Sequence, residues 1–167
     1  DNGQLVSEAI SVTKSGEVVI LDQNALTLLY RGIGGAEASA VITEQLAGEV
    51  LQTKITSLDG CGLRYLAREK HAGQAPDYGT EIAPIVAEQC ASCHREGGIG
   101  PFAMDSHLML QGWAPMIKEV LLTKRMPPMQ VDPDIGHFTN ARYIPDTDLQ
   151  KLVHWIDSGA PKGTSSV

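Results

Sequence analysis

The chain has 167 residues, of which 43% are hydrophobic and 20% are charged, a composition typical of a globular protein. Its formal net charge is −7 and it has no run of lysine or arginine, so the sequence argues against a nucleic-acid partner. No apolar stretch reaches the roughly 18 residues that a transmembrane helix requires, so we expect no membrane span. A chain of this length can form one domain or two small ones.

Residues 1–73 are predicted to form a small α+β segment. Two β-type runs, residues 18–22 and 26–30, are separated by a short stretch that contains an asparagine, which indicates a hairpin. Apolar residues at helical spacing then predict an amphipathic helix over residues 37–51. Because a hairpin is marginally stable by itself, we expect this segment to pack on the rest of the chain or on a partner protein.

The stretch after that helix contains a single cysteine and a predicted linker. Cys61 has no second cysteine near it, and an isolated cysteine is most often a buried apolar side chain, so we expect Cys61 to be buried. The alternative is a surface thiol that crosslinks to a partner in an oxidising compartment. Gly73 and Pro76 interrupt residues 69–78, which predicts a linker there. His71 falls within this linker, and we assign it no site role.

Residues 90–94 read Cys-Ala-Ser-Cys-His. On a helix, cysteines three positions apart lie on one face, from which both thiols can reach the two vinyl groups at one edge of a haem. The adjacent His94 can then turn under the ring and bind the iron. This pattern is typical of covalent c-type haem attachment, and its single occurrence predicts one haem. A thioredoxin-like pair would follow a buried strand, and a zinc site would need a second ligand pair; neither context is present.

Three helices are predicted around this motif. Thr80 can cap a first helix that runs to Cys93. A second is expected over residues 106–124, with a break near Gly112. The third is expected over residues 146–158, where apolar side chains recur at helical spacing before a glycine and a proline end it.

The second axial ligand of the iron is predicted to be a methionine. Met126 and Met129 flank two prolines, which hold the chain extended and can present a thioether at a fixed distance from the ring. We predict Met126 as the ligand, with Met129 as the second candidate and His137 as the third. The other methionines and histidines of this half are expected to be core or surface residues: Met104, Met109, Met116, His107 and His154.

Several motifs in this half resemble, in the same order, those of a family of bacterial monohaem cytochrome c domains. They are CASCHR at 90–95, GPF at 100–102, RMPP at 125–128, GHF at 136–138 and WIDSGAP at 155–161. The resemblance implies a mainly α, class I-like cytochrome c domain over residues 78–167, with Met126 of the RMPP run as the distal ligand. The chain departs from the family at Met129, where the family commonly has tryptophan. These domains occur in redox proteins of the cell envelope.

The order of hairpin and helix in residues 1–73 resembles the last third of a thioredoxin or peroxiredoxin-like domain, a kind of domain found fused ahead of such cytochromes. This segment lacks the proline that such folds place before the first of these strands. No cysteine precedes Cys61, so the redox-active pair of those domains is absent from the segment. We therefore expect a packing or docking role and no thiol–disulfide exchange activity.

An iron with both axial positions filled favours one-electron transfer over catalysis on a bound substrate. Ile99, Phe102, Ile117 and Leu121 are expected to bury the ring. We expect an electron carrier rather than an enzyme, acting on redox partner proteins either alone or as a subunit of a complex docked through residues 1–73. The alternative is a peroxidase-like haem enzyme or gas-binding protein with an open sixth position. Because haem attachment needs an exported chain, we expect the periplasm or the outer face of the cell envelope.

Overall fold

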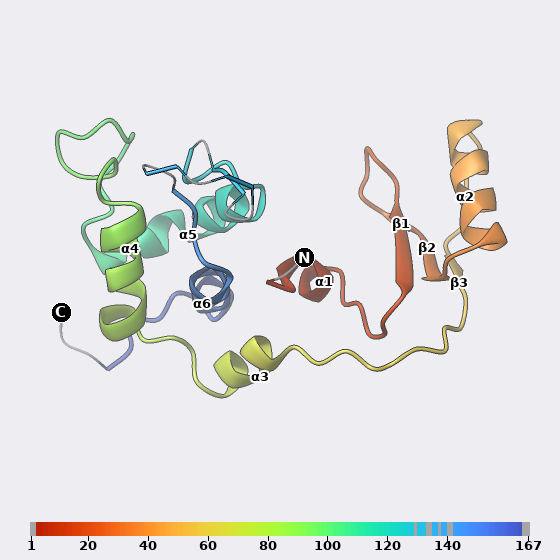
Figure 1. Ribbon diagram of the computed structural model, residues 1–167, viewed down its shortest axis with the longest axis horizontal. Coiled ribbons are helices and arrows are strands. Elements are labelled where there is room, and N and C mark those ends of the chain that lie inside the picture. The colour runs from red at the N-terminus through yellow and green to blue at the C-terminus, as the bar shows by residue number, and fades with distance from the viewer. Residues whose placement is uncertain (1–2, 129, 133–134, 137, 140–141, 165–167) are drawn as a thin grey trace. The chain divides into compact units, whose positions relative to one another are not determined.

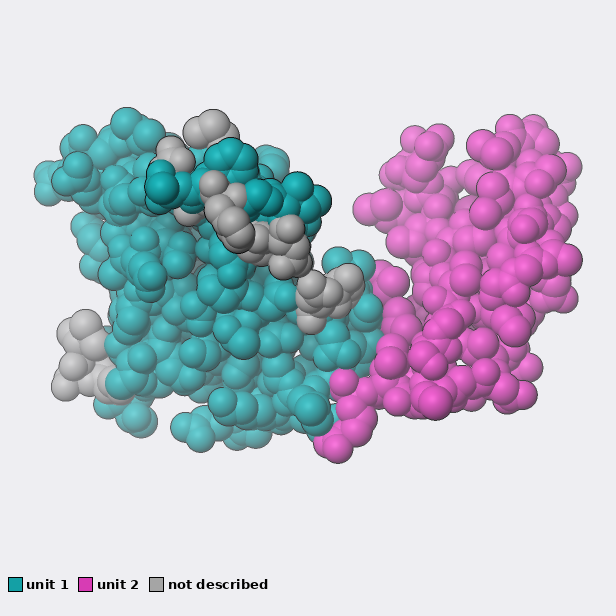
Figure 2. Space-filling view, viewed as in Figure 1, with its two compact units in different colours: residues 1–9, 65–167 teal, residues 10–64 magenta. Residues whose placement is uncertain are grey.

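The computed structural model describes residues 3–128, 130–132, 135–136, 138–139 and 142–164. The chain divides into two compact units, coloured separately in Figure 2: unit 1 contains residues 1–9 and 65–167, and unit 2 contains residues 10–64. This division differs from the expected one of 1–73 and 78–167. The difference arises because both the first helix of the chain and the expected linker contact the last helix.

Unit 2 is a three-stranded sheet with one helix. Strands β1 (Glu17–Leu21) and β2 (Leu28–Ile33) form the predicted antiparallel hairpin. Helix α2 (Ala36–Leu46) then leads to a short strand β3 (Lys54–Ile55), which pairs parallel to β2 and was not predicted. The sheet order is therefore β1-β2-β3, and Figure 1 shows α2 beside the sheet. The helix ends at Leu46 rather than at residue 51.

Local chemistry explains the hairpin and the end of α2. The carboxylate of Asp22 accepts hydrogen bonds from the backbone N–H groups of Asn24 and Ala25, at 2.9 and 2.6 Å, and these bonds hold the pKa of Asp22 below its ordinary value. Gly48 takes a φ of +77°, a left-handed conformation that is favourable for glycine just beyond a helix. A small core of Leu29, Tyr30, Ala38 and Val41 joins the helix to the sheet.

Unit 1 is helical (Figure 1). Its elements are α1 (Leu5–Ala9), α3 (Leu66–Gly73), η1 (Tyr78–Ile82), α4 (Ala83–Gln89), α5 (His107–Leu122) and α6 (Asp146–Asp157). The linker prediction is wrong over residues 69–73, because these residues belong to α3, which packs against α6 and buries His71. No helix among the described residues is both long and apolar enough to cross a membrane.

The first predicted helix of unit 1 begins with a π-helical turn. The cap is Asp77 rather than Thr80: Oδ1 of Asp77 accepts hydrogen bonds from the backbone N–H and the hydroxyl of Thr80, both at 3.0 Å. The element changes from π to α geometry at Ala83. Pro84 lies at the start of α4, where its missing N–H costs little.

Helix α5 runs unbroken through Gly112 and Pro115, so the predicted break near Gly112 is wrong. Ser106 caps it by accepting a hydrogen bond from the backbone N–H of Met109, at 3.4 Å. Helix α6 matches its prediction closely, and Gly159 ends it with a φ of +87°.

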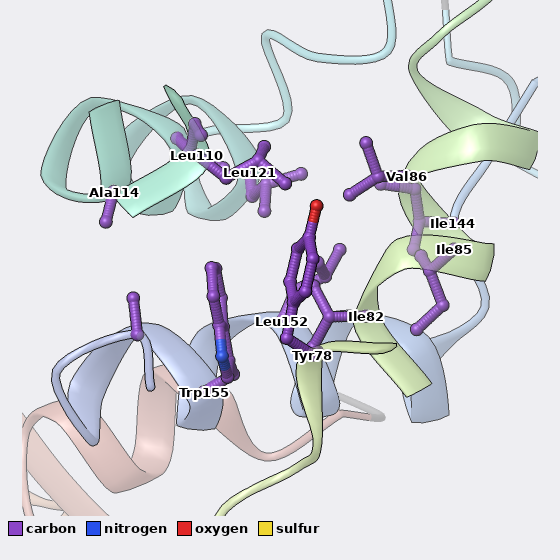
Figure 3. Close-up of a cluster of buried hydrophobic side chains, with 12 residues drawn as sticks. Tyr78, Ile82, Ile85, Val86, Leu110, Ala114, Leu121, Ile144, Leu152 and Trp155 are labelled. Carbon is purple, nitrogen blue, oxygen red and sulfur yellow. The ribbon is translucent and has the colours of Figure 1, made fainter. Parts of the chain in front are cut away.

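The core of unit 1 lies between η1, α4, α5 and α6. Figure 3 shows apolar side chains from these elements converging on Trp155, which rises from α6 and is 1% exposed. The ring of Trp155 stacks on that of Tyr78, with centroids 6.0 Å apart, and its Nε1 donates to the backbone carbonyl of Pro161 at 2.8 Å. This core holds the end of α4 against α5 and so fixes the position of the cysteine motif that follows α4.

Candidate functional site

The motif at residues 90–94 lies in a tight turn after α4, not on the helix that the sequence predicted. The helix ends at Gln89, and the backbone N–H groups of Cys93 and His94 both donate to the carbonyl of Cys90, at 3.1 and 3.0 Å. The turn nevertheless keeps both cysteines and the histidine along one cavity. The three side chains therefore lie along one cavity, as the spacing predicts, but a turn rather than a helix brings them there.

That cavity has a volume of about 730 Å³, within the range of sites for small organic ligands and cofactors. Every described residue that the sequence assigned to the haem site lines it: Cys90, Cys93, His94, Ile99, Phe102, Ile117, Leu121 and Met126. Ile99 is 90% exposed, so its part in excluding water depends on contact with a bound group. The second and third ligand candidates, Met129 and His137, lie outside the described residues.

His94 has a defined orientation. Its Nδ1 lies 3.1 Å from the backbone carbonyl oxygen of Phe102. A carbonyl oxygen can only accept a hydrogen bond, so Nδ1 carries a proton, and in the neutral imidazole this leaves the lone pair on Nε2. Histidines that bind metals are held in this way, with the far nitrogen donating to a carbonyl or carboxylate. The imidazole is therefore prepared to ligate through Nε2.

The backbone approaches His94 closely at Gly100. A Cβ atom on Gly100 would lie 2.8 Å from Nδ1 of His94 and 3.0 Å from the carbonyl oxygen of Cys93. The N–H of Gly100 donates to that same carbonyl at 2.9 Å, which keeps the loop against the motif. Residue 100 therefore has to be glycine for this loop to lie so close to the imidazole.

Met126 reaches the same cavity from the end of α5. The backbone N–H groups of Arg125 and Met126 both donate to the carbonyl of Val120, at 2.9 and 3.2 Å, which ties the start of the RMPP run to the last turn of the helix. The peptide bond between Met126 and Pro127 is cis, and Pro127 is buried. One thioether is thus anchored to the same helix that supplies Ile117 and Leu121 to the cavity wall.

The environment of Cys90 is strongly apolar. Its side chain packs against the core of unit 1, and burial raises the pKa of its thiol from 9.0 to about 11. The thiol is therefore protonated at neutral pH. Cysteines that act as nucleophiles or redox centres have the opposite property, a lowered pKa that favours the thiolate.

Sequence reasoning missed several residues of this cavity. Arg142 lines it, and its Nη1 donates to Oγ of Ser92, between the two cysteines, at 2.5 Å. An isolated arginine fifty positions from the motif gives no sequence signal for such a contact. Met104 and Met116, expected to be core or surface residues, also line the cavity, as does Trp155.

The other described histidines of unit 1, His71, His107 and His154, do not line the cavity. His107 donates a hydrogen bond from Nε2 to the backbone carbonyl of Ala160, 2.8 Å away. His71 and His154 contact each other in the interior of unit 1. The expectation that Cys61 is buried is wrong: it is exposed, and its backbone carbonyl accepts a hydrogen bond from Ser15 at 2.9 Å.

The residues present fit a haem better than a bare metal ion. The described part of the chain has no group of three or more histidine, cysteine, aspartate or glutamate side chains arranged to hold a metal ion. One imidazole and one thioether in an apolar cavity suit an iron that brings its own four equatorial nitrogens. The two thiols at the same cavity suit attachment of that ring at one edge. No family model, curated protein or solved structure matched the chain in comparisons with known proteins.

Proposed function

We propose that unit 1 is a c-type cytochrome that carries one haem, joined through thioether bonds to Cys90 and Cys93 and ligated by His94 and Met126. The observation that carries the proposal is that all four side chains line a single apolar cavity. The tautomer of His94 supports it, because the hydrogen bond to the Phe102 carbonyl leaves Nε2 free to ligate.

The protein's part in this function is to orient and enclose the haem and to tune its reduction potential. A bound haem supplies one-electron chemistry at its iron. His94 and Met126 would both bind the iron and leave no position there for a substrate, which favours an electron carrier over an enzyme. Ile117 and Leu121, both buried in α5, would keep water from the haem. A neutral thioether favours ferrous iron and so raises the reduction potential.

The raised pKa of Cys90 disfavours a thioredoxin-like role for the cysteine pair. A thiol with a pKa of about 11 is a poor nucleophile for disulfide exchange at neutral pH. Addition of a thiol to a vinyl group held against it requires proximity, which the cavity provides. Unit 2 contains one exposed cysteine, Cys61, and so it has no pair for such chemistry.

The expected partners are redox proteins that meet unit 1 transiently, since electron-transfer interfaces are small. Unit 2 serves in packing or docking, as a subunit contact within a larger redox complex. Thioether attachment takes place on exported chains, which assigns the protein to the periplasm or the outer face of a bacterial envelope.

The test is expression with export and a c-type haem maturation system. The purified chain should keep its haem colour on a denaturing gel, and acid–acetone should not extract the haem. Cys90→Ala combined with Cys93→Ala should abolish the stain, whereas Cys61→Ser, a matched cysteine change outside the motif, should retain it. Binding of carbon monoxide distinguishes the proposed electron carrier from the alternative function, because a peroxidase-like or gas-binding site would bind it readily in the reduced wild-type protein.

A further inference from the structure

Phe102 lies between His94 and a tryptophan on the neighbouring helix. Its ring is 5.1 Å from that of His94, tilted by 60°, and 4.7 Å from that of Trp113, to which it is nearly parallel at 12°. These centroid distances are those of favourable aromatic pairs. The same residue, Phe102, accepts the hydrogen bond of His94 Nδ1 at its backbone carbonyl. A side chain and a carbonyl of one residue therefore contact the imidazole together.

The loop that presents this carbonyl is tied mainly to the cysteine motif itself. Gly100 donates to the carbonyl of Cys93, and Met104 donates to the carbonyl of His94, both at 2.9 Å. These bonds hold the loop and the motif to each other but do not join them to a long element. Met104 packs against the core of unit 1, and the stack of Phe102 on Trp113 adds a contact beside the carbonyl itself with a residue in the middle of the 16-residue helix α5.

Trp113 is 37% exposed, so it is not a filling residue of the core. Its ring makes a parallel stack with Phe102, with the two centroids 4.7 Å apart. Helix α5 also supplies Ile117 and Leu121 to the cavity, so the stack fixes the loop relative to the same cavity wall.

We infer that Trp113 is a positioning residue for His94: by stacking on Phe102 it holds the Phe102 carbonyl against Nδ1 and so fixes the orientation and hydrogen bond of the imidazole. This inference rests on the proposed function of His94 as a haem ligand. A hydrogen bond from the far nitrogen of a metal-binding histidine to a backbone carbonyl orients the ring and raises its basicity. Without the stack, the loop can move away from the imidazole and expose the Nδ1–H to water.

The measurement is the solvent exchange rate of the His94 Nδ1 proton, followed by NMR in the full, haem-loaded chain. Trp113→Leu removes the stack, and we expect exchange to become about tenfold faster, which corresponds to the loss of an ordinary hydrogen bond. Trp113→Phe keeps a stacking ring and should restore exchange close to the wild-type rate. Leu108→Ala, a change at a 75% exposed position on the same helix, should leave the rate unchanged.

Unchanged exchange in Trp113→Leu, or equally fast exchange in Trp113→Phe, would overturn the inference. Circular dichroism of each variant checks that it is folded. A wild-type chain that fails to retain haem would contradict the proposed function instead. In that case the nitrogen chemical shifts of His94 in the haem-free chain still test the positioning role: the Nδ1–H tautomer should dominate in the wild type, and Trp113→Leu should shift it toward a mixture.

Discussion

The Nδ1 atoms of His71 and His154 lie 2.8 Å apart in the interior of unit 1. Nε2 of His154 lies 2.9 Å from Oε2 of Glu8, so one histidine of α6 connects α3 to α1. The carboxylate of Glu8 accepts a hydrogen bond from Nε2 of His154, and one proton lies between the two facing Nδ1 atoms. The other oxygen of Glu8, Oε1, is buried without a hydrogen-bond partner among the described residues. Three ionisable groups from three helices thus form a buried hydrogen-bonded network.

This hydrogen-bonded network predicts that the free energy of unfolding of unit 1 falls in mild acid. Burial lowers the pKa of His71 from 6.5, and the adjacent His154 and the nearby Lys70 and Lys151 lower it further, while Glu81 opposes them. The unfolded chain therefore binds a proton more readily than the folded one. The contribution of His71 to the free energy of unfolding is therefore fully present above about pH 6.5, and it is lost as the pH falls from there toward the lower pKa of the folded state.

Chemical denaturation at a series of pH values between about 5 and 8 measures this effect, across the range in which histidine titrates. His71→Asn removes the titrating ring and should flatten the pH dependence, although the variant is less stable at every pH. A wild-type stability that stays constant across this range would contradict the expected titration.

Glu8 should contribute to the attachment of α1. Its side chain is 9% exposed and its carboxylate accepts from His154, so Glu8→Ala should lower the free energy of unfolding by about 2 kcal/mol, the usual cost of losing a charged hydrogen-bond partner in the interior. Glu8→Gln keeps an accepting oxygen and should cost less. Urea denaturation of both variants makes the comparison, and equal losses would show that the hydrogen bond is not what matters.

Two glycines give a matched pair of stability changes. At Gly100 an added Cβ would meet Nδ1 of His94 at 2.8 Å, so Gly100→Ala should cost about 1–3 kcal/mol and weaken the orientation of the imidazole. At Gly112, inside α5, nothing lies within 4 Å of an added Cβ. Gly112→Ala should therefore stabilise the protein by about 0.5–1 kcal/mol. Thermal unfolding distinguishes the two directions.

Replacing Met126 by alanine should open the sixth iron position. The sulfur-to-iron absorption band at the red end of the ferric spectrum should disappear, the reduction potential should fall, and the reduced protein should bind carbon monoxide. Met129→Ala serves as the comparison and should have much smaller effects. An exchange of the two outcomes would identify Met129 as the ligand. If neither variant changes the spectrum, His137 is the next position to test.

The sequence predicted the elements whose signals are local. The hairpin of β1 and β2 and the periodic helix α6 are present as expected. Helix α3 could not be predicted in this way, because its sequence is polar and its burial depends on the contact of His71 with His154, 83 positions away. The cavity residues named in advance came from the cysteine motif, the methionine beside the two prolines and nearby apolar residues, whereas Arg142 joins them through a contact with Ser92, fifty positions distant.

Unit 1 is built from two segments that lie on either side of unit 2 in the sequence, and this arrangement affects the order in which the two units can fold. Residues 10–64 are continuous, so unit 2 can fold before the segments that follow it are available. Helix α1 is synthesised before unit 2, yet the histidine to which Glu8 binds follows it by 146 positions. Until α6 appears, α1 has no partner from that helix. Unit 1 can therefore complete its packing only once α6, which follows Cys90 and Cys93 in the sequence, is available.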